Sequence, residues 1–153
     1  MPQLTKREKR LKTWSLLWGI LFLLTDAVFI LYGQTMLRII NKIGWFFNFR
    51  YPIDEAGGTF WLILASANMI VISFVCLKVF INVRKNYSLI QIILVSKLAS
   101  SLVAIAFFRM IAFHFAYLVI FFVDLVIFFI FLALYISVAI ESKEESSHDA
   151  KNP

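Results

Sequence analysis

The chain of 153 residues has one cysteine, two histidines and five glycines, and these shortages exclude several kinds of chemistry. The lone cysteine, Cys76, rules out an internal disulfide and a cysteine-based metal cluster. The histidines, His114 and His148, do not stand at a metal-ligand spacing, and the glycines form no phosphate-binding loop. No Ser/His/Asp set occurs in a plausible register for nucleophilic catalysis. The sequence therefore disfavours an enzyme, offers no metal site and identifies no cofactor.

Apolar residues are abundant instead. They make up 61% of the chain, which includes 17 phenylalanines, whereas ordinary soluble domains are about 45–50% apolar. A single soluble core of this size could not bury so much apolar surface, so the surface must be covered by lipid. The chain is long enough for one domain, and the expected class is an integral membrane protein whose first partner is the lipid bilayer.

Four apolar runs are each long enough for the roughly 20 residues that cross a bilayer core. Their predicted spans are residues 14–37, 59–81, 88–108 and 113–140. Backbone groups in lipid must be satisfied within a segment, which favours helices, and short connections make neighbouring helices antiparallel. The expected fold is an all-α, up-down-up-down bundle of four transmembrane helices over residues 14–140.

Basic residues predict the orientation of this bundle. The N-terminal region (1–13), the turn near Arg84 and the C-terminal tail (141–153) would share one side with ten basic residues, against four on the other side. The richer side is expected to be cytoplasmic, so both termini are placed in the cytoplasm. The positive charge suits an anionic membrane surface rather than nucleic acid. The polar tail, with His148, is predicted to be disordered and solvated.

The long connection over residues 38–58 has apolar residues on one helical face and polar residues on the other. This pattern indicates a helix in the outer membrane interface, with Trp45 and Tyr51 as aromatic anchors, that ends near Pro52 and the pair Gly57–Gly58. It is interpreted either as a loop that follows the membrane surface or as a lid over the outer mouth of the bundle.

One strongly polar residue lies near the middle of each span: Asp26, Asn68, Lys97 and Asp124. Each is about nine to twelve residues from an end of its span, so at about 1.5 Å per residue all four reach a similar depth. A charge at the centre of a membrane helix costs about 2.5–3.5 kcal/mol, so these charges should face inward and pair. The sequence predicts an intramembrane network of Asp26, Asn68, Lys97, Ser101 and Asp124, with Lys97 between the two aspartates.

This network has one more negative than positive charge. Two carboxylates that share one ammonium group in a dry site tend to keep a proton between them, so one aspartate is expected to be protonated near neutral pH. Helical spacing supports an inward seam: Gly19, Phe22 and Asp26 share a stripe, and the glycine would let a partner helix come close.

A second polar group is predicted at the outer end of spans three and four. It comprises Arg109, His114 and Tyr117. His114 is the residue there that could titrate near physiological pH, and the alternative is an interfacial histidine without a functional role.

The motif "SKLASS" (residues 96–101), followed by "AYLVIFFVDLVIF" (residues 116–128), resembles the small four-span DoxX-like membrane proteins and their prokaryotic relatives. The resemblance implies a location in a prokaryotic cytoplasmic membrane and a role beside membrane complexes, and it carries over no site residue. Glutathione-dependent membrane enzymes share the size but have a Glu-Arg…Asn pattern that "WLILASANMI" lacks.

Three functions remain open from the sequence. The first is a subunit or accessory of a membrane complex, or a homo-oligomer, in which the Asp–Lys–Asp network fixes helix register. The second is a small proton- or ion-coupled transporter or channel that uses the same residues. The third is a lipid- or quinone-binding membrane protein, suggested by the excess of aromatic residues.

Overall fold

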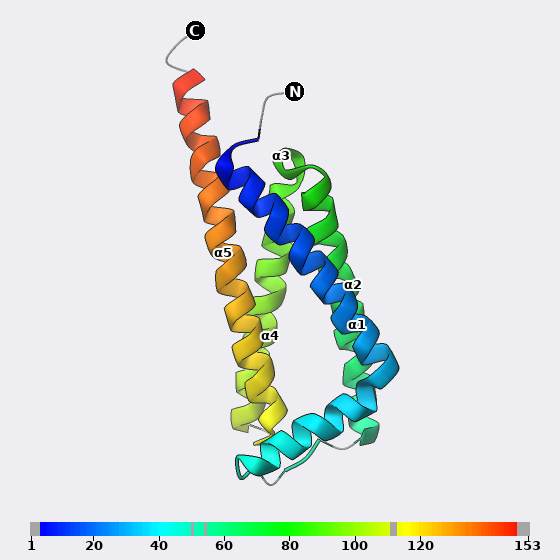
Figure 1. Ribbon diagram of the computed structural model, residues 1–153. Helices are drawn as coiled ribbons and strands as arrows, with labels where there is room; N and C mark the ends of the chain where they lie inside the picture. Colours follow the sequence, from blue (N-terminus) through cyan, green and yellow to red (C-terminus); the bar gives the residue numbers. More distant parts are fainter. Residues whose placement is uncertain (1–3, 50, 54, 111–112, 150–153) are drawn as a thin grey trace.

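Helices dominate the part of the chain that the structure describes, which comprises residues 4–49, 51–53, 55–110 and 113–149. In the computed structural model the elements are α1 (Lys6–Phe46), α2 (Glu55–Ile81), α3 (Val83–Asn86), the 3-10 helix η1 (Tyr87–Leu89), α4 (Ile90–Met110) and α5 (Phe115–Asp149) (Figure 1). No strand occurs within those ranges. Four stretches there are long and apolar enough to cross a membrane, namely Lys6–Phe46, Leu62–Ile81, Val83–Met110 and Phe115–Glu141. The prediction of an all-helical chain with four such helices is confirmed.

Helix α1 extends beyond the predicted first span at both ends. A capping box fixes its start: Glu8 N donates to Thr5 Oγ1 at 3.1 Å, and Thr5 N donates to Glu8 Oε2 at 2.8 Å. These bonds satisfy N–H groups that have no partner within the helix. The helix therefore begins at Lys6, inside the predicted basic N-terminal region, and it runs to Phe46, inside the predicted interfacial segment.

A bend divides α1 into two parts at Tyr32, whose φ of −130° and ψ of 21° are not helical. Gly33 follows, and a Cβ there would lie 2.6 Å from Leu62 Cδ1, so the glycine lets α2 approach closely. After the bend, α1 crosses to the ends of α4 and α5 (Figure 1), where the ring of Phe47 stacks on Phe115 with centroids 5.7 Å apart. The interfacial helix predicted for residues 38–58 thus belongs, up to Phe46, to α1, and its function as a lid stays a prediction.

The helices form two pairs, because α1 packs mainly along α2 and α4 mainly along α5. Both chain ends and α3 lie at one end of the molecule, called here the terminal end, and the two pairs diverge toward the opposite end (Figure 1). The main cluster of buried apolar residues, which includes Leu11, Val79, Ile90 and Phe131, comes from chain segments at the terminal end. The two pairs are therefore held together chiefly in that half.

Helix α5 does not end where the sequence predicted the start of a disordered tail. It continues through residues 141–149, a segment rich in glutamate and serine with one lysine. Glutamate and lysine have good helix propensity, and adding residues to an existing helix avoids the cost of nucleation. Residues 150–153 lie outside the described part of the chain.

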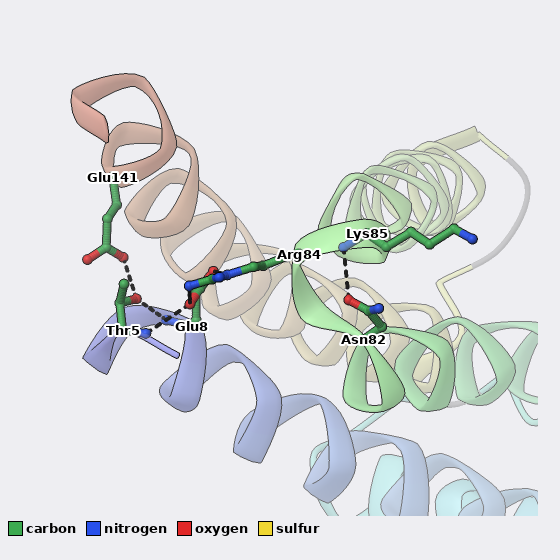
Figure 2. Close-up of polar contacts among 6 residues, drawn as sticks. All are labelled: Thr5, Glu8, Asn82, Arg84, Lys85 and Glu141. Carbon is green, nitrogen blue, oxygen red and sulfur yellow. Dashed lines mark hydrogen bonds and ion pairs between the residues drawn. The ribbon is translucent and has the colours of Figure 1, made fainter. Parts of the chain in front are cut away.

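A group of polar contacts joins three helices at the terminal end (Figure 2). Arg84, which belongs to α3, donates from Nε to Glu8 Oε1 at 2.7 Å and from a second guanidinium nitrogen to Glu8 Oε2 at 3.1 Å. Thr5 Oγ1 donates to Glu141 Oε2 of α5 at 2.7 Å. We call Thr5, Glu8, Arg84 and Glu141 the terminal clasp. Because it connects α1 to α3 and α5, it fixes where the first helix starts in the bundle.

Acid should weaken the terminal clasp. The hydrogen bonds from Arg84 hold the pKa of Glu8 below its ordinary value of 4.5, against the opposing effect of burial. A lowered pKa in the folded state means that the stabilisation is present above pH 4.5 and is lost as the pH falls through the folded value. Because the Arg84 side chain is 38% exposed, the contribution should be about 0.2–1 kcal/mol.

Thermal unfolding of the wild type and Glu8→Gln in detergent measures this contribution. We expect the wild type to have the higher melting temperature at neutral pH, and the difference to vanish well below pH 4.5. Arg84→Gln should reproduce the loss and serves as the partner variant. An equal difference at both pH values would contradict the assignment of the titration to Glu8.

Candidate functional site

A buried ion pair lies at the centre of the α4–α5 pair. Lys97 Nζ is 2.8 Å from Asp124 Oδ1, and the two side chains are 5% and 10% exposed. Lys97 comes from the middle of α4, on the same stripe as the buried Ser101 and Ala104. Its ammonium group also lies 5.2 Å from the centroid of the Phe22 ring on α1, a distance at which the ring face attracts a cation. Lys97 thus contacts both an anion and an aromatic face.

Ser101 fixes the same two helices one turn further along α4. Its hydroxyl donates to the backbone oxygen of Phe121 at 3.2 Å. Asp124 stands three residues after Phe121, so both contacts reach one short stretch of α5. A hydrogen bond and an ion pair in neighbouring turns set the register of α4 on α5, since a shift of either helix would break both.

Asp26 is buried, at 5% exposure, but it is not the second partner of Lys97. Among the described residues it forms no ion pair, and its Oδ1 has no hydrogen-bond partner. The sequence predicted that Lys97 lies between two aspartates. In the structure Lys97 pairs with Asp124 of α5 but not with Asp26 of α1. The reason is the order of the helices: α1 packs mainly on α2 and then on α5, rather than along α4. Phe22, one turn before Asp26, makes the contact with Lys97 instead.

Asn68 joins α2 to α4 through a residue that the sequence did not single out. Ser96 Oγ donates to Asn68 Oδ1 at 3.0 Å, so the amide contacts the residue before Lys97 rather than Lys97 itself. The motif SKLASS contains several serines, and the sequence alone does not indicate which of their hydroxyl groups faces a neighbouring helix.

The predicted outer polar group is brought together in part. The rings of His114 and Tyr117 meet edge to face with centroids 5.4 Å apart. His114 Nδ1 lies 2.7 Å from the backbone oxygen of Tyr51, and because a carbonyl only accepts, Nδ1 must carry the proton. Arg109 is exposed, and no described contact joins it to His114 or Tyr117. The carbonyl of Tyr51 was missed because a backbone acceptor leaves no signature in the sequence.

An open groove lies beside the bend of α1. It is lined by residues 29–35 of α1 and by residues of α2 between Leu62 and Ile70. Most of these side chains are apolar, while Tyr32, Thr35 and Ser66 add hydroxyl groups and Gln34 adds an amide. The groove can accept a thin apolar chain but has no charged lining residue to hold a polar head.

No protein-family model, curated protein or solved structure matches this chain. The site is therefore defined by its own geometry: a Lys97–Asp124 ion pair with the Phe22 ring 5.2 Å from Lys97 Nζ, and a separate buried carboxyl group at Asp26.

Proposed function

We propose that this chain is an integral membrane protein that carries protons across a bilayer, and that Asp26 is the group that binds the proton. The observation that supports this proposal is the environment of Asp26. Its side chain is buried, at 5% exposure, and its Oδ1 has no hydrogen-bond partner among the described residues. A buried polar oxygen without a partner costs free energy unless another group binds it. Ionisable residues inside membrane segments are functional candidates for this reason.

The surface of the helices suits a lipid environment. Large apolar side chains are exposed along all of the long helices, among them Leu31 (71%), Ile63 (63%), Val95 (69%) and Phe122 (59%). In the proposed arrangement the four long helices cross the bilayer up-down-up-down, and both chain ends are cytoplasmic. The common position of the two ends (Figure 1) and the basic residues at that end support this orientation.

The charges of the site explain why a proton would bind there. Lys97 and Asp124 neutralise each other at 2.8 Å, so Asp26 brings the one excess negative charge. Between Leu62 and Leu77, α2 offers no acidic or basic side chain, and α5 offers only Asp124 between Phe115 and Leu134. Binding one proton at Asp26 makes this group of three residues neutral as a whole. Releasing it restores one excess negative charge to the group.

The same ion pair argues against an assembly function for Lys97. A lysine that served to recruit another subunit would need its counter-charge on that subunit. Here Asp124 supplies it from the next helix of the same chain. The pair is therefore assigned to the register of α4 on α5, and assembly with other subunits is the less favoured proposal.

A lipid- or quinone-binding function has one observation in its favour, which is the groove beside the bend of α1. The groove lies within residues 29–35 and 62–70, outside the Lys97–Asp124 pair. Retention of a lipid or quinone during gentle extraction, detected by native mass spectrometry, would favour this second candidate.

The proposal predicts the behaviour of Asp26→Asn in liposomes. The purified protein is reconstituted with a pH-sensitive dye inside, and proton entry is followed after acidification of the outside. The wild type should acidify the interior faster than protein-free liposomes, because Asp26 can take up and release protons. Asp26→Asn should reduce entry to the protein-free rate, since an amide does not titrate in this range.

Glu141→Gln provides the matched control, because it makes the same change from carboxyl to amide at the terminal end. It should keep the wild-type rate. Wild-type flux in a folded Asp26→Asn protein would overturn the assignment of the proton to Asp26.

A further inference from the structure

Two further polar atoms on the Asp26 face of α1 are buried without a partner. Ser15 is fully buried, and neither its Oγ nor the indole Nε1 of Trp18 has a hydrogen-bond partner in the structure. Both stand on the terminal side of Asp26, and at about 1.5 Å per residue Ser15 lies about 16 Å from it along the helix axis. An unsatisfied buried donor or acceptor costs about 1–3 kcal/mol, and buried water molecules usually satisfy such groups. Ser15 and Trp18 together offer water both donors and an acceptor.

Along α1, Phe22 lies between these two residues and Asp26. The positions 15, 18, 22 and 26 follow the spacing of one helical face, and Phe22 is 5% exposed. Its ring lies against Trp18 on one side, with centroids 5.6 Å apart, and its centroid is 5.2 Å from Lys97 Nζ. A benzene ring can neither pass on a proton nor hold water in a hydrogen-bonded chain.

We propose that Ser15 and Trp18 bind water on the terminal side of Phe22, and that the Phe22 ring is the gate between this water and Asp26. The inference rests on the proposed function, because it takes Asp26 as the proton-binding group. In the open state the ring turns aside and water connects the two sites. A hydrated proton then gives its proton to the Asp26 carboxylate and becomes neutral water, and the reverse step returns the proton.

Proton flux through Phe22 variants tests the gate in the liposome assay. Phe22→Ala should raise the rate of proton entry about tenfold, which corresponds to a barrier lowered by about 1.4 kcal/mol. Phe122→Ala, which makes the same change at an exposed position of α5, should keep the wild-type rate. The double variant Phe22→Ala/Asp26→Asn should fall to the protein-free rate. A folded Phe22→Ala protein with unchanged flux, or a double variant that keeps the raised flux, would overturn the gate.

These outcomes separate the gate from the proposed function. If Asp26→Asn abolishes flux while Phe22→Ala changes nothing, the gate fails and the function of Asp26 stands. If Asp26→Asn alone leaves flux unchanged, the proposed function fails whatever Phe22→Ala does.

Hydrogen exchange of the Trp18 indole N–H tests the proposed water site. Because it is measured on the wild type, the result does not depend on whether Phe22→Ala folds. In heavy water the Trp18 signal, assigned with Trp18→Phe, should exchange about as fast as that of Trp45, which is 78% exposed. Protection of the Trp18 N–H to the level of backbone amides in the core would show a dry site and overturn the proposal of bound water.

Discussion

Replacing Lys97 by methionine should lower the free energy of unfolding by about 3–5 kcal/mol, the usual effect of removing one partner from a buried pair. The ion pair with Asp124 is short, at 2.8 Å, and both side chains are nearly inaccessible. Methionine can occupy much of the same space, so the loss arises from the carboxylate that remains without a counter-charge. Reversible unfolding in mixed micelles, followed by circular dichroism, measures the effect.

A double variant shows whether the loss comes from charge or from shape. Lys97→Met/Asp124→Leu removes both charges and should recover most of the lost stability, because apolar residues of similar volume often replace a buried pair without penalty. Ser96→Ala is the neighbouring control, and it should cost about 1 kcal/mol for the hydrogen bond to Asn68. Full stability of Lys97→Met alone would contradict a structural function of the pair.

Periodicity in the sequence predicted the buried faces of α1 and α4. Gly19, Phe22 and Asp26 form a buried stripe on α1, and Lys97 and Ser101 do so on α4. Gly19 also meets α2 closely, because a Cβ there would lie 3.2 Å from Cys76 Cβ. Such stripes are visible in a sequence because side chains three and four residues apart share one face of a helix.

The ends of the helices were less predictable than their middles. Hydropathy marks the apolar stretch, but α1 begins eight residues before the predicted start of its span, at Lys6 instead of position 14. The reason is a local one: Thr5 and Glu8 cap the helix, and Arg84 holds Glu8 from another element. The bend at Tyr32 was not predicted either, because no proline marks it in the sequence. As a result, α1 continues to Phe46, where a separate interfacial helix was expected.

The partners of Asp26 could not be read from its depth in the sequence. Depth along a helix follows from counting residues, but the neighbour that faces a side chain depends on the order and rotation of the helices. Asp26 and Lys97 were placed at one level, yet the ring of Phe22 rather than the Asp26 carboxylate lies near the ammonium group. The sequence predicted the Lys97–Asp124 ion pair, while the isolation of Asp26 emerged only from packing.

Removing the charges of Asp26, Lys97 and Asp124 together should show whether these residues are needed for folding, for proton flux or for both. The variant Asp26→Leu/Lys97→Met/Asp124→Leu keeps none of these three buried charges, so we expect a stable fold. Its proton flux in liposomes should fall to the protein-free rate, because the Asp26 carboxyl group, the proposed proton-binding group, has been removed. The double variant without the Asp26 change should keep flux.

This comparison distinguishes the two functions that share the same residues. If the charges serve only to set helix register, the triple and double variants should fold alike and neither should differ from the wild type in flux. Loss of flux in the triple variant alone assigns proton transfer to Asp26, since the two variants differ only at that residue. Retained flux in a folded triple variant would show that protons take another route, and Phe22 would then have no connection to a proton path.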